Sequence, residues 1–70
     1  MKKEKIYIAG CRGMLGEAFY KKFSHDFDLK CTDIDVNESW LSYLDIRDYE
    51  TYRKDVFDFN PDFLFHLGAY

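Results

Sequence analysis

The chain has 70 residues, fewer than the roughly 100–150 of an ordinary domain, which excludes two domains. With 47% hydrophobic and 20% aromatic residues it is too apolar for a disordered tail. Its net charge of −3 does not provide the excess of positive charge that attracts polyanions, so we expect neither nucleic acid nor an anionic membrane surface as a partner.

Targeting and metal-binding signals are missing from the sequence. No apolar run approaches the ~20 residues of a membrane span, and the run 6–9 is too short for a signal-peptide core. Cys11 and Cys31 are fewer cysteines than a small secreted domain usually carries, which favours a reduced, cytoplasmic location. Two isolated histidines and no cysteine cluster match no metal-site spacing, so we expect no metal.

Hydrophobic spacing predicts five elements in chain order. Residues 6–9 read as a buried strand, and the apolar residues between Met14 and Phe23 lie on one face of a helix. Phe27, Leu29 and Cys31 alternate with polar residues, which indicates a second strand. Residues 33–44 have no clean period and read as a loop.

The second half of the chain predicts another helix and another strand. Asp48 is a suitable N-cap for a helix that Asn60-Pro61 ends, because the residue before proline avoids the α region. Residues 63–67 are nearly all apolar, as in a strand covered on both faces. The order β-α-β-α-β predicts an α/β fold with a parallel sheet and right-handed crossovers.

The chain ends directly after this third strand. In a doubly wound sheet of order 3-2-1-4, strand 6–9 would then be left as an exposed edge without its fourth neighbour. We therefore expect residues 1–70 to be the first half of a larger domain, truncated after the third strand.

A glycine-rich segment connects the first strand to the first helix. Gly10, Gly13 and Gly16 form G-x-x-G-x-x-G, in which the first glycine permits a tight turn and the second allows a pyrophosphate to approach. The third allows the helix to pack closely on the strand, and the helix N-terminus favours phosphate. In this strand–turn–helix context the motif predicts a dinucleotide site; a merely glycine-rich connection is the alternative.

Two charged residues give opposite indications about the cofactor. Asp33 stands at the end of the second strand, where an acidic residue would bond the ribose hydroxyls and favour NAD. Arg12, inside the glycine loop, could pair with the 2′-phosphate of NADP. The choice between NAD and NADP stays open, and a solvated turn carboxylate is the alternative for Asp33.

The motifs resemble those of extended short-chain dehydrogenases/reductases that act on nucleotide sugars. The stretch 8–16 (Ile-Ala-Gly-Cys-Arg-Gly-Met-Leu-Gly) resembles the start of these enzymes, and its Arg-Gly-Met part (12–14) resembles the GDP-fucose synthase family in particular. The stretches 44–48, 60–62 and 68–70 resemble dTDP-4-dehydrorhamnose reductases. Residues 65–69 also resemble the wider epimerase/dehydratase family, with Gly68 in place of an alanine. The resemblance implies a Rossmann-type fold that binds NADP or NAD.

The resemblance also implies a set of cofactor contacts. It places Gly10, Arg12, Gly13, Met14 and Leu15 around the pyrophosphate and the adjoining ribose. Asp33 would hold the adenosine ribose, and Asp45 and Ile46 would flank the adenine. Leu67, Gly68 and Ala69 would line the path towards the nicotinamide. An equal alternative for Asp45 is that it helps to start the second helix.

Catalytic residues are not expected in this chain. The family uses a Tyr-x-x-x-Lys pair for acid–base chemistry, and none of the six tyrosines stands four residues before a lysine. We therefore expect a parent enzyme that transfers hydride from NADPH or NADH to a 4-keto nucleotide sugar, with the sugar bound by a missing C-terminal part. A homodimer of the parent is one assembly that the resemblance allows.

Three other functions remain open from the sequence. The parent could be an NAD-dependent epimerase or dehydratase, or a non-catalytic NAD(P)-binding module. The chain could also be a stand-alone α/β module that binds no nucleotide.

Overall fold

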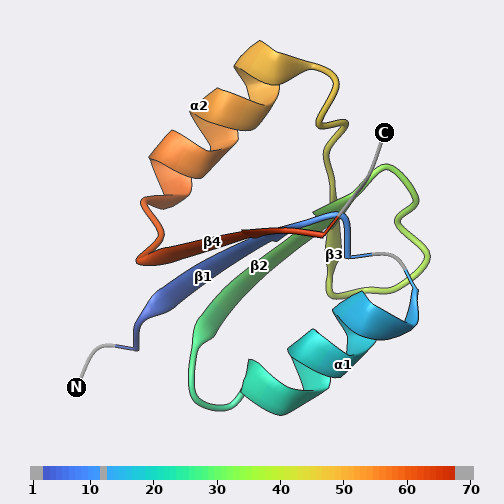
Figure 1. Cartoon of the computed structure of the whole chain (residues 1–70), viewed down its shortest axis with the longest axis vertical. Helices are drawn as coiled ribbons and strands as arrows, with labels where there is room; N and C mark the ends of the chain where they lie inside the picture. Colours follow the sequence, from blue (N-terminus) through green and yellow to red (C-terminus); the bar gives the residue numbers. More distant parts are fainter. Residues whose placement is uncertain (1–2, 12, 68–70) are drawn as a thin grey trace.

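The computed structural model describes residues 3–11 and 13–67, which form a parallel sheet between two helices. The strands are β1 (Lys5–Ala9), β2 (Asp28–Asp33), β3 (Leu41–Tyr43) and β4 (Phe63–His66). Helix α1 (Met14–Phe23) covers one face of the sheet, and α2 (Tyr49–Phe59) covers the other (Figure 1). The three layers confirm the α/β prediction.

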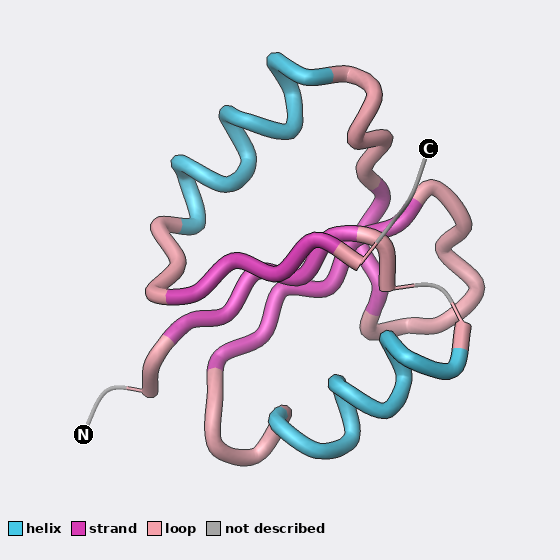
Figure 2. Tube along the Cα trace, viewed as in Figure 1, coloured by secondary structure: helices cyan, strands magenta, loops and turns pink. Residues whose placement is uncertain are grey.

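The strands pair in the order β3-β2-β1-β4, with every pairing parallel. Ile8 in β1 stands opposite Cys31 in β2 and Phe65 in β4, which fixes the register on both sides. Figure 2 shows the strands together in the middle layer, with a helical crossover on each side. This arrangement is a partial Rossmann-like α/β fold.

Two predictions about the sheet are wrong. The segment 33–44 is not all loop, because Leu41–Tyr43 pairs with Cys31–Asp33 as β3. Strand β1 is not an edge: β4, expected as the third of three strands, pairs directly with it. The edges of the described sheet are β3 and β4. In β4, Phe63 and Leu64 are 47% and 50% exposed, so this strand is not covered on both faces as predicted.

Strand alternation divides the core into two clusters, one on each face of the sheet. The first contains Ile6, Ile8, Cys11, Cys31 and Leu41, and α1 contributes Phe19 and Tyr20 to it. The second contains Tyr7, Ala9 and Leu44, and α2 contributes Tyr52, Val56 and Phe59. Residues of β1 with odd and even numbers therefore face opposite helices, as the two-residue period of a strand requires.

The two helices differ in how well the sequence predicts them. Asp48 caps α2 as predicted, since its carboxylate accepts from the Thr51 amide at 3.5 Å and the Thr51 hydroxyl at 2.8 Å. Asn60 ends α2 in the left-handed region, with φ of 53°. In α1 the predicted apolar face is partly wrong: Met14 and Leu15 are 88% and 59% exposed.

Candidate functional site

The glycine loop is attached to β2 immediately before Asp33. The backbone amides of Gly10 and Cys11 both donate to the Thr32 carbonyl, at 2.8 and 3.0 Å. These two bonds extend the β1–β2 pairing past the end of β1 and hold the start of the loop at the carboxyl end of the sheet. Gly10 and Asp33, which are far apart in sequence, are therefore neighbours here, as the motif predicts.

Each glycine of the motif has a separate structural reason. Gly10 and Gly13 have φ of 81° and 96°, a region that strongly favours glycine. A Cβ on Gly16 would lie 1.8 Å from the Cys11 carbonyl oxygen, so only glycine lets α1 approach the loop this closely. At Gly13, by contrast, a Cβ would meet nothing within 4 Å, so the backbone there borders open space.

Helix α1 begins at this open space. The Glu17 amide donates to the Gly13 carbonyl at 3.1 Å and closes the first turn. No side chain caps this helix start among the described residues. The first amides of α1 are then available to an anion, which the positive end of the helix dipole also favours.

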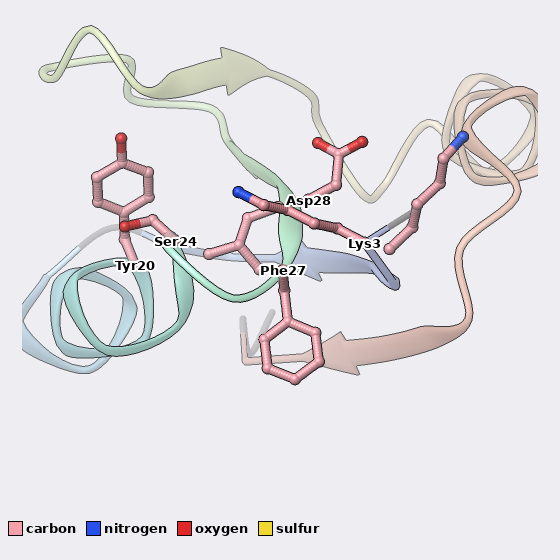
Figure 3. A pocket seen from close by; sticks show the side chains of 7 residues that line it. Lys3, Tyr20, Ser24, Phe27 and Asp28 are labelled. Atoms are coloured by element: carbon pink, nitrogen blue, oxygen red, sulfur yellow. The ribbon is translucent and has the colours of Figure 1, made fainter. Parts of the chain in front are cut away.

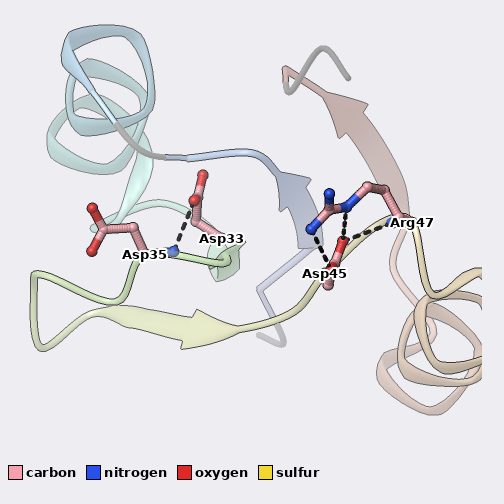
Figure 4. Close-up of polar contacts among 4 residues, drawn as sticks. All are labelled: Asp33, Asp35, Asp45 and Arg47. Atoms are coloured by element: carbon pink, nitrogen blue, oxygen red, sulfur yellow. Dashed lines mark hydrogen bonds and ion pairs between the residues drawn. The ribbon is translucent and has the colours of Figure 1, made fainter.

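Asp33 is the last residue of β2 and is 6% exposed. Its Oδ1 accepts the Asp35 amide at 3.0 Å, which holds the carboxylate at the strand end (Figure 4). Its own carbonyl accepts the Leu44 amide at 3.0 Å and ties β2 to the segment that leads to Asp45. The structure therefore places Asp33 next to the glycine loop and Asp45 two residues after the end of β3.

The Asp45 carboxylate is held by Arg47. Oδ1 accepts the Arg47 amide at 2.9 Å and Nε at 3.0 Å, while Oδ2 pairs with a terminal guanidinium nitrogen at 2.9 Å (Figure 4). The hydrogen bonds from Arg47 lower the pKa of Asp45. The residue that caps α2 is Asp48, not Asp45. The Asp45 carboxylate already accepts three hydrogen bonds from Arg47, so its remaining capacity to accept others is small. Ile46, beside it, packs partly against the Tyr7 cluster.

Three of the other expected contact residues lie beside the glycine loop, and three lie outside the described residues. The Leu67 amide donates to the Ala9 carbonyl at 2.8 Å, which brings the end of β4 beside the start of the glycine loop. Met14 and Leu15 are exposed at the first turn of α1, next to the loop. Arg12, Gly68 and Ala69 lie outside the described residues.

A hollow of about 180 Å³ adjoins the glycine loop. Cys11, Gly13 and Met14 form one side of it, and Asn37, Glu38 and Trp40 line the other. The Trp40 ring stacks on Tyr20 of α1, with centroids 4.4 Å apart and planes 10° from parallel. The sequence did not predict that Asn37, Glu38 and Trp40 line this hollow, because the segment before β3 has no hydrophobic periodicity. The hollow is smaller than the ~300–1,000 Å³ of a typical ligand site, so it fits only part of a dinucleotide.

A larger hollow of about 340 Å³ lies at the opposite end of the sheet (Figure 3). Lys3, Lys5, Phe27 and Asp28 line it at the amino ends of β1 and β2. Ligands of open α/β sheets bind outside the carboxyl ends of the strands. The candidate site is therefore the end that carries the glycine loop.

Comparison with known proteins found no family model that matches the sequence and no curated protein significantly similar to it. Along the described part of the chain, no helix is both long and apolar enough to cross a membrane. The described residues also bring together no group of three potential metal ligands.

Proposed function

We propose that this chain binds NAD(P) at the carboxyl end of its parallel sheet, as the dinucleotide-binding part of a nucleotide-sugar reductase. One observation carries the proposal: a loop with glycines at φ of 81° and 96° joins β1 to α1 and is bonded to β2 immediately before Asp33. A plain strand–helix connection does not require this combination. The unbridged pair Cys11 and Cys31 supports a cytoplasmic location.

The residues present fit the groups of a dinucleotide. Open space at Gly13 and the first amides of α1 suit the pyrophosphate, which needs close approach to the backbone. The Asp33 carboxylate suits the ribose hydroxyls. The segment at Asp45 and Ile46 suits the adenine, with Ile46 offering an apolar contact. Leu67 at the end of β4 lies on the side where the nicotinamide would extend.

The proposed reaction belongs to the parent protein. The loop, Asp33 and the first turn of α1 would hold NADPH or NADH, which would supply the hydride for reduction of the carbonyl carbon of a 4-keto nucleotide sugar. This sequence contains no Tyr-x-x-x-Lys, so its proposed share of the reaction is to bind and orient the cofactor. An NAD-dependent epimerase or dehydratase, or a non-catalytic NAD(P)-binding module, would use the same loop in the same way.

Titration of the full chain with NADH and, separately, with NADPH tests the proposal. Trp40 lines the hollow beside the loop, so its emission should fall on binding while the nicotinamide emission rises. Gly13→Val places a side chain in the open space and should weaken binding at least about tenfold, the effect of lost close approach. Lys54→Val on the exposed face of α2 is the control and should bind like the wild type.

Circular dichroism should show both variants folded. Absence of saturable binding by the folded wild-type chain would refute the proposal. Equal affinities for wild type and Gly13→Val would refute the assignment of the pyrophosphate to the loop.

A further inference from the structure

Strand β4 is an edge of the sheet that lacks the usual protection against pairing with another chain. Within the described part of the chain, β1 lies on one side of it and no strand lies on the other. Its sequence, Phe-Leu-Phe-His, contains no lysine, proline or carboxylate, which natural edge strands use to prevent such pairing. The opposite edge, β3, is protected by its length of only three residues.

The backbone of β4 offers hydrogen-bonding groups to a further strand. At the end of β4, the Leu67 amide donates to the Ala9 carbonyl of β1 at 2.8 Å. Successive residues of a strand direct their amides and carbonyls to opposite sides, so Phe65, two residues earlier, also directs its backbone groups to β1. The amides and carbonyls of Leu64 and His66 therefore point away from β1, toward the open side of the sheet.

Apolar surface flanks this edge on both faces of the sheet. Phe63 and Phe65 are 47% and 39% exposed on the face of α1, and Leu64 is 50% exposed on the face of α2. The hollow beside β4 on the first face, about 360 Å³, has an entirely apolar lining: Ile6, Phe19, Phe23, Phe27, Phe63 and Phe65. The hollow on the second face, about 190 Å³, is lined by Tyr49, Tyr52, Arg53, Val56 and Leu64. A partner that fits this edge must add a strand and cover apolar side chains on both faces.

We propose that this partner is a second copy of the chain, whose β4 pairs antiparallel with the first about a two-fold axis at Phe65. Leu64 of each copy then lies opposite His66 of the other, so the backbone groups that point outward meet and exchange hydrogen bonds. On the face of α1, Phe65 lies opposite Phe65 of the second copy, and Phe63 lies opposite Leu67. The same patch serves both partners, as a two-fold interface requires.

The charges along the edge suit this pairing. The residues that meet are apolar, except for His66, so the interface brings no carboxylates together although each chain has a net charge of −3. Association also stops at two copies. Pairing uses β4 of both chains and leaves only the short strand β3 at each end of the joined sheet.

The exposed apolar area is sufficient for a weak dimer. An aromatic side chain carries about 200 Å², so the exposed fractions of Phe63, Phe65 and Tyr49 (67% for Tyr49) amount to about 300 Å² in each copy. With Leu64 and the strand backbone, two copies bury roughly 1,000 Å², the lower end of a specific interface. We therefore expect a Kd of about 1–100 µM.

Sedimentation velocity of the full chain between about 1 µM and 1 mM tests the proposal. We expect the mass to rise with concentration from 8.4 kDa to twice that value and no further. Leu64→Lys places a charge at the interface twice, once from each copy, and should raise the Kd at least about tenfold. Tyr43→Lys on the other edge strand, at a position 69% exposed, is the matched control and should dimerise like the wild type.

A cross-link tests the position of the axis. In the proposed register the two Phe65 residues form a non-hydrogen-bonded pair with Cα atoms about 4.5 Å apart, which is within reach of a disulfide. Mild oxidation should therefore produce covalent dimer at least about tenfold faster in Phe65→Cys than in Phe63→Cys, which lies opposite Leu67. The wild-type chain, whose own cysteines are buried, should produce none.

Circular dichroism shows which of these chains are folded. A folded wild-type chain that stays monomeric at 1 mM would overturn the proposal and leave this edge to another protein or segment. Growth beyond the dimer, or equal effects of Leu64→Lys and Tyr43→Lys, would overturn it as well. No nucleotide is present in these experiments, so their outcome is independent of the proposed function.

Discussion

Replacing Gly16 with alanine should destabilise the fold, although helix propensity alone favours the change. Gly16 lies inside α1, where alanine is worth about 1 kcal/mol over glycine. The added Cβ, however, would lie 1.8 Å from the Cys11 carbonyl oxygen and 2.4 Å from its carbon. These are backbone atoms, and the Cys11 amide is bonded to Thr32, so the loop cannot retreat without losing that bond.

The magnitude follows from these opposing effects. Overpacking a well-filled site costs about 1–3 kcal/mol, and contact with fixed backbone belongs at the upper end. After the gain in helix propensity, we expect the free energy of unfolding to fall by about 2 kcal/mol. For a chain of this size, that loss lowers the melting temperature by about 8–16 °C.

Urea unfolding followed by Trp40 emission measures this change, because Trp40 stacks on Tyr20 of α1 and therefore reports the docking of that helix. Ala18→Gly, at an exposed position of the same helix, is the control and should cost about 1 kcal/mol through propensity alone. A Gly16→Ala chain as stable as the wild type, or more stable, would refute the close approach of α1 to the loop.

Four other predictions follow from named contacts. Burial acts to raise the pKa of Asp55, but hydrogen bonds from Lys30 and Tyr7 outweigh it and lower the pKa. The free energy of unfolding should therefore fall as the pH drops below about 4. In urea titrations, Asp55→Asn should make the free energy of unfolding depend less on pH in this acid range. Burial raises the pKa of Tyr7, so unfolding should become easier above about pH 10, and Tyr7→Phe should remove this alkaline loss. Asn60→Ala should cost about 1 kcal/mol in thermal melts because Asn60 has φ of 53°, whereas Asn60→Gly should not destabilise. Arg12→Ala should weaken NADPH more than NADH, and equal effects would show that Arg12 does not contact the 2′-phosphate.

Sequence patterns predicted the elements that are long or that carry strong local signals. The Asp48 cap and the Asn60-Pro61 stop are local chemistry, so the limits of α2 could be predicted within a residue. Strand β3 has only three residues, and its pairing with β2 defines it; no periodicity can appear over that length. The neighbour of β1 was also missed, because strand order depends on contacts between distant segments.

The candidate site also contains some features that the sequence could predict and others that it could not. The conformations of Gly10 and Gly13 follow from the motif, and the position of Asp33 follows from the end of β2. The Arg47 fork on Asp45 and the hollow beside Trp40 could not be predicted, because they depend on side-chain orientation after β3 and on the path of residues 34–40. In α1, Gly16 shares the face toward the sheet with Phe19 and Tyr20, three and four residues on, and Met14 and Leu15 lie in solvent.

The most direct test of the central claim is an amide NMR titration of the full, isotopically labelled chain with NADH. The account predicts saturable shifts concentrated at Gly10, Gly13, the first turn of α1 and Asp33. Shifts confined to the hollow near Phe27 and Asp28, or no saturable shifts in a spectrum with the dispersion of a folded protein, would contradict it.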